Sequence, residues 1–250
     1  MKEWGEIRAW RKAQRVELIA RRAALDAGIR AVATQCVTRL LIGGLAVDSR
    51  MIVGFCWPYE GELDARFAVR HWRRQGAAAA LPEVVAAGLP LRFRRWWPGA
   101  PMKAAVMGIP VPDGTEVVTP DVAVVPMVGW DANGYRLGYG GGYFDATLAA
   151  LSPRPVAVGL SYGSARLETI FPMAHDIAMD FVVTEAAIYE AGGNAVQPLA
   201  VERARERTRE LLAVRGLPRR HVVEESQGYS SPPCYAHELP GLMGENGPES

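Results

Sequence analysis

Four closely spaced glycines lie between Arg136 and Asp145, in the stretch VVPMVGWDANGYRLGYGGGYFDATL from Val124 to Leu148. Because glycine has no side chain, successive backbone N–H groups can turn toward one anion. The apolar residues at the start of the stretch predict a buried strand. Residues Tyr143 to Leu148 are predicted to open a helix, whose N-terminus adds a positive dipole end. The stretch therefore suits a polyphosphate.

Glycine clusters also form ordinary turns and hairpins, so the motif must be compared with known phosphate-binding loops. It is not a Walker A loop, because no Gly-Lys-Ser/Thr follows the glycines. It is not the dinucleotide fingerprint either, since Pro126 and the polar turn Asp131-Ala132-Asn133-Gly134 follow the strand. The pattern needs another explanation.

The run RLGYGGGYFD (136–145), preceded by VPMVGWDANG (125–134), resembles the signature of the 5-formyltetrahydrofolate cyclo-ligase family, also called 5,10-methenyltetrahydrofolate synthetase. The family pattern is roughly P-G-x-x-F-D-x-x-G-x-R-L-G-x-G-x-G-Y-Y-D. In this chain Met127 stands for the first Gly, Trp130 for the usual Phe and Phe144 for the second Tyr. Gly141 stands at a position that is Lys in some members, where that lysine is expected beside the ATP phosphates.

Other matches follow in the same order along the chain. The runs RKAQR (11–15) and RRAAL (21–25) resemble the family's opening K-x-x-x-R helix and its R-R-x-A-L end. PYEGELD (58–64) resembles a region that borders the folate; Asp64 keeps the acid there and Ala65 replaces a Thr. PMAHDIAMDFVVTE (172–185) is similar to the closing segment. The resemblance spans about Glu6 to Ala187.

The resemblance implies an ATP- and Mg²⁺-dependent ligase that converts 5-formyltetrahydrofolate to 5,10-methenyltetrahydrofolate with release of ADP and phosphate. Such a reaction needs charge neutralisation and positioning around the moving phosphoryl group more than covalent help. The implied substrate is a small molecule, a reduced folate. Two alternatives stay open because no lysine stands at position 141. The chain could be a paralogue that binds ATP or folate without efficient turnover, or could act on another formylated or carboxylated small molecule.

The resemblance also assigns roles to individual residues. The implied catalytic residues are Arg136, Tyr143 and Asp145. The implied nucleotide-binding residues are Arg11, Lys12, Arg15, Arg136, Leu137, Gly138, Tyr139, Gly140, Gly141, Gly142 and Tyr143. The implied folate-binding residues are Tyr59, Glu62, Asp64, Trp96 and Tyr143. The implied Mg²⁺ ligands are Asp145 and Asp180.

Each assignment has a plainer interpretation. Arg11 and Arg15 could lie on a solvated helix face, and Lys12 or Lys103 could replace the missing lysine charge. Asp145 in the first turn of a helix would stabilise the helix dipole in any case. His175 is expected to be structural, because phosphoryl transfer requires no histidine base.

The composition limits the class of protein. At 250 residues and 49% hydrophobic, the chain can bury a full core as one domain. A net charge of +1 provides no global field for holding DNA or an anionic membrane, so neither partner is expected. Three cysteines, at 36, 56 and 234, are too few and too irregular for a disulfide framework or a zinc site. These cysteines favour a reducing cytoplasm, and without a signal-like or membrane-spanning apolar run neither secretion nor membrane spanning is expected. We also expect a monomer.

Strands and helices that could position these residues alternate along the chain. The predicted strands are Met51–Trp57, Ala77–Leu81, Val122–Met127, Pro155–Leu160 and Phe181–Thr184. The predicted helices are Glu6–Asp26, Arg66–Gln75, Tyr143–Leu151 and Ala200–Arg215. This pattern indicates an α/β fold with three layers, a mostly parallel central sheet and helices on both faces, Rossmann-like and of the cyclo-ligase type.

Three segments are expected along the chain. Residues 1–190 form the cyclo-ligase-like domain, 191–224 a helical extension, and 225–250 a Pro/Gly/Ser-rich tail that is disordered or serves for docking. Cys234 and His237 in the tail lack a second ligand pair for a metal site. The run Arg92–Trp97 could be a platform for single-stranded nucleic acid, but a strand that partly lines a pterin pocket is favoured.

Overall fold

The computed structural model describes residues 3–105, 108–191 and 196–219. These residues belong to one compact unit, Met1–Arg220. The predicted tail 225–250, with Cys234 and His237, lies outside the described residues. No helix in the described part of the chain is long and apolar enough to cross a membrane.

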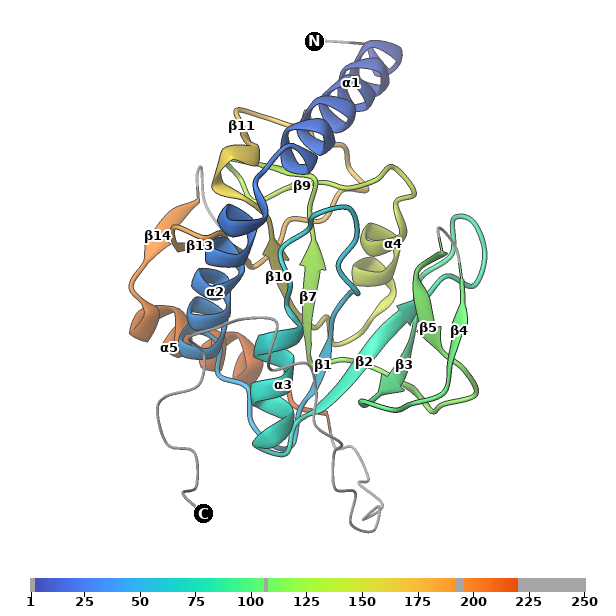
Figure 1. Ribbon diagram of the computed structural model, residues 1–250, viewed down its shortest axis with the longest axis vertical. Helices are drawn as coiled ribbons and strands as arrows, with labels where there is room; N and C mark the ends of the chain where they lie inside the picture. The colour runs from blue at the N-terminus through green and yellow to red at the C-terminus, as the bar shows by residue number, and fades with distance from the viewer. Residues whose placement is uncertain (1–2, 106–107, 192–195, 220–250) are drawn as a thin grey trace. The chain divides into compact units, whose positions relative to one another are not determined.

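A nine-stranded sheet runs through the described residues, with the strand order β14-β13-β12-β10-β7-β1-β2-β3-β6 (Figure 1). Its neighbouring central strands pair in parallel. They are β1 (Ile52–Gly54), β2 (Ala78–Glu83), β7 (Val122–Pro126), β10 (Val156–Leu160) and β12 (Phe181–Val183). The flanking strands pair antiparallel. They are β3 (Arg92–Trp96), β6 (Val117–Val118), β13 (Ile188–Glu190) and β14 (Gln197–Leu199).

The continuous apolar runs explain the central strands. Every residue of β10 is buried, and in β7 only Pro126 is not fully buried. Side chains alternate between the two faces: Val122 and Val124 belong to one hydrophobic cluster, whereas Ala123 and Val125 belong to another. Both faces must therefore be covered, as the sequence predicted for these strands.

One face packs against α2 (Ala27–Gly44), α3 (Arg66–Arg74) and α5 (Val201–Val214). The other face packs against α1 (Trp4–Ala23) through Leu18, against α4 (Tyr143–Ala150) through Leu148, and against a small sheet. That small sheet has the order β11 (Arg166–Leu167), β8 (Gly129–Asp131), β9 (Arg136–Leu137). The predicted α/β fold, with a mostly parallel sheet between helical layers, is confirmed (Figure 1).

Helix α2 is absent from the sequence-based prediction. Its apolar residues spread around the helix and alternate with threonines and glycines, so they form no clear stripe. The predicted helix Glu6–Asp26 instead ends at Ala23, and the Asp26 side chain accepts a hydrogen bond from the Gly28 N–H at 2.7 Å to begin α2. A hairpin of β4 (Met102–Ala104) and β5 (Pro110–Pro112) was also missed.

The order of the parallel strands reverses between β1 and β7. The chain runs from β1 outward to β2, returns to β7 on the other side of β1, and continues to β10 and β12. In open α/β sheets, ligands bind beyond the carboxyl ends of the strands at such a switch point. The topology therefore identifies the place where a site is expected, independently of any motif.

Candidate active site

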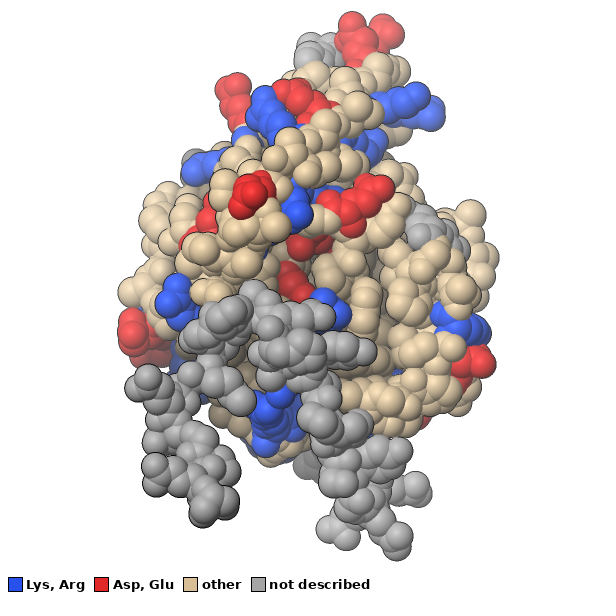
Figure 2. Space-filling view, viewed as in Figure 1, with Lys and Arg blue, Asp and Glu red and all other residues tan. Residues whose placement is uncertain are grey.

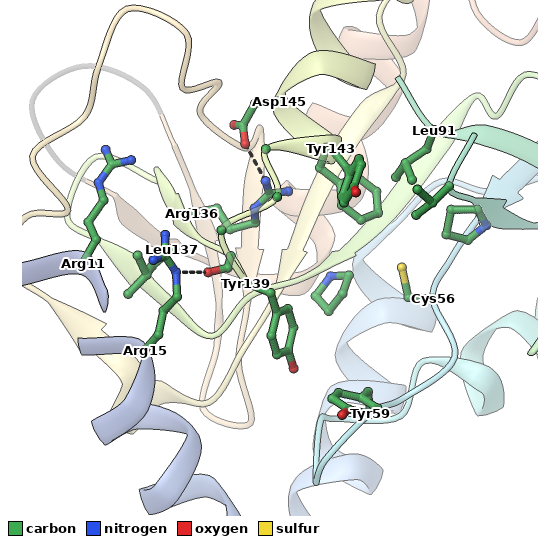
Figure 3. A pocket seen from close by; sticks show the side chains of 18 of the residues that line it. Arg11, Arg15, Cys56, Tyr59, Leu91, Arg136, Leu137, Tyr139, Tyr143 and Asp145 are labelled. Atoms are coloured by element: carbon green, nitrogen blue, oxygen red, sulfur yellow. Dashed lines mark hydrogen bonds and ion pairs between the residues drawn. The ribbon is translucent and has the colours of Figure 1, made fainter. Parts of the chain in front are cut away.

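A cavity of about 970 Å³ lies at this switch point. Cys56 and Trp57 line it just after β1, Leu81 and Pro82 line it from β2, and Pro126 lines it at the end of β7. Helix α1, the glycine loop 138–142 and the β4–β5 hairpin contribute the other walls. In Figure 3, the cationic side chains of Arg11, Arg15 and Arg136 lie on one side of the cavity and Cys56 and Leu91 on the other.

A tight turn directs Arg136 into the cavity. Fully buried Asp131 accepts hydrogen bonds from the N–H groups of Asn133 and Tyr135 at 2.9 and 3.0 Å, which fixes the turn between β8 and β9. Gly134 at this turn has φ +82°, a conformation that favours glycine. The sequence predicted a central strand before the glycine loop. In the structure the β8–β9 hairpin lies between that strand, β7, and the loop.

The glycine loop is hydrogen-bonded to helix α1. The Arg15 Nε donates to the carbonyl of Gly138 at 2.6 Å, as Figure 3 shows. Gly140 and Gly142 have φ values of +100° and +65°, and Gly142 is the N-cap of α4. The loop therefore ends in the helix N-terminus that the sequence predicted, with its backbone N–H groups near the cavity.

Arg136 is the most informative side chain of the site. Its guanidinium is buried, and Nη2 donates to Asp145 Oδ2 at 2.6 Å. Among the described residues, Nε and Nη1 have no hydrogen-bond partner. Burial lowers the pKa of Arg136, although Asp145 opposes this effect. Because an unpartnered buried donor is costly, these two nitrogens lack an acceptor that a ligand packed against the guanidinium would supply.

Adjacent residues on α1 differ in what their charges contact. Arg11 is buried, so the solvated-face interpretation is wrong for this residue. It donates to Asp176 at 2.6 Å and to the carbonyls of Ile170 and Phe171, both at 2.9 Å. Lys12 also lines the cavity but is exposed and forms no ion pair within the described part of the chain. Arg11 therefore fixes the 170–176 segment, whereas Lys12 has its charge available.

Gly141, where some members of the family carry Lys, makes room for an aromatic ring. A Cβ atom at this position would lie 2.5 Å from Cε2 of Tyr143. The Tyr143 ring therefore occupies the volume that a side chain at position 141 would need. The ring lines the cavity between the cationic and the apolar sides (Figure 3).

The side of the cavity that faces away from α1 is mostly apolar. Its lining residues come from β1, β2, the β4–β5 hairpin and their loops: Trp57, Leu81, Pro82, Val84, Leu91, Ile109, Pro110 and Val111. Cys56 also lies here, and burial raises the pKa of its thiol. Trp96 supports this wall from behind, because its ring packs edge-on against Trp57 at a centroid distance of 5.8 Å.

Most of the residues that the sequence singled out line this one cavity. They are Arg11, Lys12, Arg15, Tyr59, Glu62, Arg136, Leu137, Gly138, Tyr139, Gly140, Gly141, Gly142, Tyr143 and Asp145. Three others do not line it: Asp64, Trp96 and Asp180. Asp64 instead pairs with Arg66 at 2.7 Å and accepts from the Arg66 N–H at the start of α3.

Asp180 lies immediately before β12, at the amino ends of the parallel strands, whereas the cavity lies at their carboxyl ends. Its carboxylate accepts hydrogen bonds from Arg154 at 2.7 Å, from Arg215 at 2.6 and 2.8 Å, and from the Ala157 N–H at 2.8 Å. The geometry does not bring Asp180 together with Asp145, with which it was paired as a magnesium ligand. Asp180 holds the strands and the helix α5 segment together instead.

Sequence reasoning missed Asp176, which lines the cavity beside Arg11. The signal was present, because the closing segment contains a His-Asp pair four residues before Asp180. Arg8 was missed too, although it lies one helical turn before Lys12 on the same face of α1.

The carboxylates fit a magnesium ion held mainly by phosphate oxygens. Asp145 and Asp176 are the acids that line the cationic side of the cavity. Both already accept hydrogen bonds: Asp145 from Arg136 and the Ile177 N–H, Asp176 from Arg11 and the Met173 N–H. No cluster of three or more acidic, His or Cys side chains suited to a metal occurs among the described residues. Mg²⁺ typically uses one or two carboxylates together with waters and phosphates, which these two residues can provide.

Residues 7–185 match the sequence model of the 5-formyltetrahydrofolate cyclo-ligase family. The chain is 29% identical to the 5-formyltetrahydrofolate cyclo-ligase of Haemophilus influenzae, over 64% of this chain and 89% of that protein. It is 27% identical to the protein of the same name from Escherichia coli K12, over 62% of this chain and 89% of that protein.

Solved structures show the same fold. The 5,10-methenyltetrahydrofolate synthetase of Aquifex aeolicus superposes with a TM-score of 0.63 at 25% identity, covering 75% of this chain and 96% of that chain. The synthetase from Mycoplasma pneumoniae gives a TM-score of 0.58 at 19% identity, covering 70% and 98%. The matched family segment ends at residue 185, so β13, β14 and α5 lie beyond it.

Proposed function

The chain belongs to the 5-formyltetrahydrofolate cyclo-ligase family, and we propose that it converts 5-formyltetrahydrofolate and ATP to 5,10-methenyltetrahydrofolate, ADP and phosphate. The observation that carries this proposal is the Arg136 guanidinium, buried beside the glycine loop with two nitrogens, Nε and Nη1, that have no partner among the described residues. A triphosphate supplies the acceptors that this guanidinium lacks.

The chemistry explains why ATP is needed. A formamide oxygen leaves poorly, because nitrogen donation makes the carbonyl unreactive and the departing group would be oxide or hydroxide. Transfer of the γ-phosphoryl group to that oxygen breaks the bond to ADP and forms an imidate-like phosphate. N10 of the folate then attacks the formyl carbon, loses its proton, and the C–O bond breaks as inorganic phosphate leaves.

This chain's residues would position and stabilise the groups that change charge. Arg136 neutralises charge on the moving phosphoryl group, and the backbone N–H groups of residues 138–142 bind its oxygens. Lys12 supplies the nearby cation that the glycine at position 141 cannot. Arg15 acts mainly through the loop, because its Nε donates to the Gly138 carbonyl. A magnesium ion held by Asp145 and Asp176 would add positive charge at the phosphates.

The apolar side of the cavity suits the folate. Trp57 and Tyr59 line this side and supply aromatic surface for a pterin ring, and Glu62 can accept hydrogen bonds from ring or amino N–H groups. Burial raises the pKa of Glu62, while Tyr139 and Arg22 oppose this effect. The Tyr143 ring lies between this side and the phosphate side, so the formyl group would be directed toward the phosphates.

The absorbance of the conjugated methenyl product provides the test. Purified protein is mixed with 5-formyltetrahydrofolate, ATP and Mg²⁺, alongside an Asp145→Ala variant. We expect a near-ultraviolet rise that requires ATP and is lost in the variant. A flat trace from folded wild-type protein that still binds ATP would contradict the proposal and favour a paralogue without turnover.

A further inference from the structure

The glycine loop has a single side chain. Between Gly138 and Gly142, Tyr139 is the one residue that is not glycine. A loop of glycines has wide conformational freedom, so its position depends on the Tyr139 side chain as well as on the bond from Arg15 to the Gly138 carbonyl. Figure 3 shows the Tyr139 side chain extending from the glycine loop toward the loop that carries Tyr59.

The Tyr139 hydroxyl makes two short hydrogen bonds across the cavity wall. It donates to Glu62 Oε1 at 2.7 Å and accepts from Arg22 Nη2 at 2.7 Å. Its ring also contacts Tyr59 edge-on, with the centroids 6.1 Å apart. Tyr139 itself is 37% exposed, whereas the Glu62 and Arg22 side chains that bind its hydroxyl are each 6% exposed.

The 59–62 loop has an unusual backbone that other contacts hold in place. Glu60 has φ +46° and Gly61 has φ +79°, and a left-handed conformation is uncommon for a residue such as glutamate. Arg22 Nε donates to the Glu60 carbonyl at 3.0 Å, and the Tyr162 hydroxyl donates to the Gly61 carbonyl at 3.0 Å. Such a conformation persists only when its surroundings over-determine it.

Arg22 therefore contacts both loops at once. One guanidinium nitrogen fixes the 59–62 backbone, and another bonds the only side chain of the glycine loop. Glu62 accepts hydrogen bonds from the Tyr139 hydroxyl through Oε1 and from the Tyr59 N–H through Oε2, the latter at 3.1 Å. The loop assigned to phosphate and the loop assigned to folate thus share one hydrogen-bonded contact.

We propose that Tyr139, fixed by Arg22, is a positioning residue that couples the nucleotide and folate sites, so that each ligand raises the affinity for the other. This inference rests on the proposed function of the two loops. A ligand that orders one loop also fixes the shared contact and thereby lowers the entropic penalty of ordering the other loop. Coupling of this kind must be reciprocal between the two ligands.

The experiment is calorimetric titration of the full chain with the non-hydrolysable ATP analogue AMP-PNP and Mg²⁺, with and without saturating 5-formyltetrahydrofolate. For the wild type we expect the folate to tighten analogue binding at least about fivefold. In Tyr139→Phe, which keeps the ring and loses only the hydroxyl, we expect the ratio to fall below about twofold. Both separate dissociation constants are measured in the same titrations, so the coupling is read from their ratio and not from either affinity alone.

Tyr162→Phe is the matched control. It also removes one hydroxyl that holds the 59–62 loop, but Tyr162 does not belong to the glycine loop. We expect this variant to weaken folate binding and to keep the coupling ratio within about twofold of the wild type. A general loosening of the 59–62 loop would reduce the ratio in both variants, and that result would overturn the proposal.

The other outcomes separate this inference from the proposed function. A wild type that binds both ligands with a ratio near one, or a Tyr139→Phe variant that keeps the wild-type ratio, would overturn the coupling alone. A wild type that binds the ATP analogue but not 5-formyltetrahydrofolate would contradict the proposed function itself.

Discussion

Arginine and aspartate side chains pair at both ends of the parallel strands, the carboxyl end (here the carboxyl edge) and the amino end (the amino edge). The two groups differ in what their other polar atoms contact. At the carboxyl edge, Arg136 pairs with Asp145 and keeps two N–H groups without a partner among the described residues. At the amino edge, Asp180 accepts four hydrogen bonds, from Arg154, from Arg215 twice and from the Ala157 N–H. The first group can accept a ligand, whereas the second holds strands in place.

A second buried acid at the amino edge follows the same rule. Asp121, fully buried before β7, accepts from the N–H groups of Ile52 and Arg219 at 2.8 and 2.9 Å. The Arg219 guanidinium also bonds the carbonyls of Pro120 and Pro153. These bonds fasten the segment after α5 to the beginnings of β1, β7 and β10. Because buried charges are costly unless satisfied, the unpartnered nitrogens of Arg136, rather than residue type, distinguish the functional side.

The largest effect should come from replacing one arginine at each edge by methionine. Arg136→Met removes a guanidinium that lines the cavity, and we expect kcat/KM to fall about 10²- to 10³-fold, as for the loss of a transition-state donor. Arg215→Met should instead lower the free energy of unfolding by about 2 kcal/mol and leave the activity of the folded protein unchanged. The methenyl absorbance assay and urea denaturation of both variants measure these effects.

The comparison would fail if Arg136→Met and Arg215→Met changed kcat/KM and the free energy of unfolding in the same way. Arg136→Lys serves as an internal control, because it keeps a positive charge but loses the planar fork of donors. We expect its activity to lie between those of the wild type and Arg136→Met, with a denaturation midpoint near that of the wild type.

Asp180→Asn tests the amino edge directly. The carboxylate is 8% exposed and balances two arginines, so the neutral amide should destabilise the fold by about 3 kcal/mol. The Mg²⁺ concentration for half-maximal activity should not change, since Asp180 lies outside the cavity. Unchanged stability together with a raised Mg²⁺ requirement would restore Asp180 as a metal ligand.

Arg11 and Lys12 offer the same comparison within one helix. Lys12→Met should raise the KM for ATP about tenfold without loss of stability, because its charge has no ion-pair partner in the described part of the chain. Arg11→Met should mainly lower the stability, since it leaves Asp176 without its guanidinium partner. Equal KM effects from the two variants would show that both charges reach the phosphates.

The sequence predicted the parts of the molecule that local patterns determine. The runs Val122–Val125 and Val156–Leu160 are apolar without interruption, so they indicated buried central strands. The glycines after Arg136 indicated a loop leading into a helix, and α4 begins at Tyr143 as expected. Helix α2 was missed because its apolar residues surround the helix, so no stripe appears in the sequence.

Partners distant in the sequence account for the assignments that the structure does not support. Asp145 and Asp180 are both acids next to a predicted element, and nothing local separates them. Only the fold brings Arg215 to Asp180, 35 positions away, and Arg11 to Asp176, 165 positions away. The resemblance identified the segment that holds both Asp176 and Asp180. Which end of the strands each acid lies at depends on where β12 begins.

The smallest expected change in stability concerns Glu83, which, like Asp180 and Asp121, has its charge compensated by neighbouring groups. Glu83 in β2 contacts Arg94 at 2.7 Å, Arg92 at 2.8 Å and Lys103 at 3.2 Å. Although burial alone would raise it, these hydrogen bonds lower the pKa of Glu83 from 4.5 to about 2. Because the folded pKa lies below the unfolded one, the ionised group contributes stability above about pH 4.5 and loses that contribution as the pH falls toward 2.

Glu83→Gln should therefore lower the free energy of unfolding by about 1 to 2 kcal/mol at pH 7, since Arg92 and Lys103 are partly exposed and solvent screens them. The difference from the wild type should shrink steadily between about pH 4.5 and pH 2, where Glu83 becomes neutral in both states. Urea denaturation of both proteins across this range measures it. A difference that stays constant with pH would mean that Glu83 contributes through packing and not through its compensated charge.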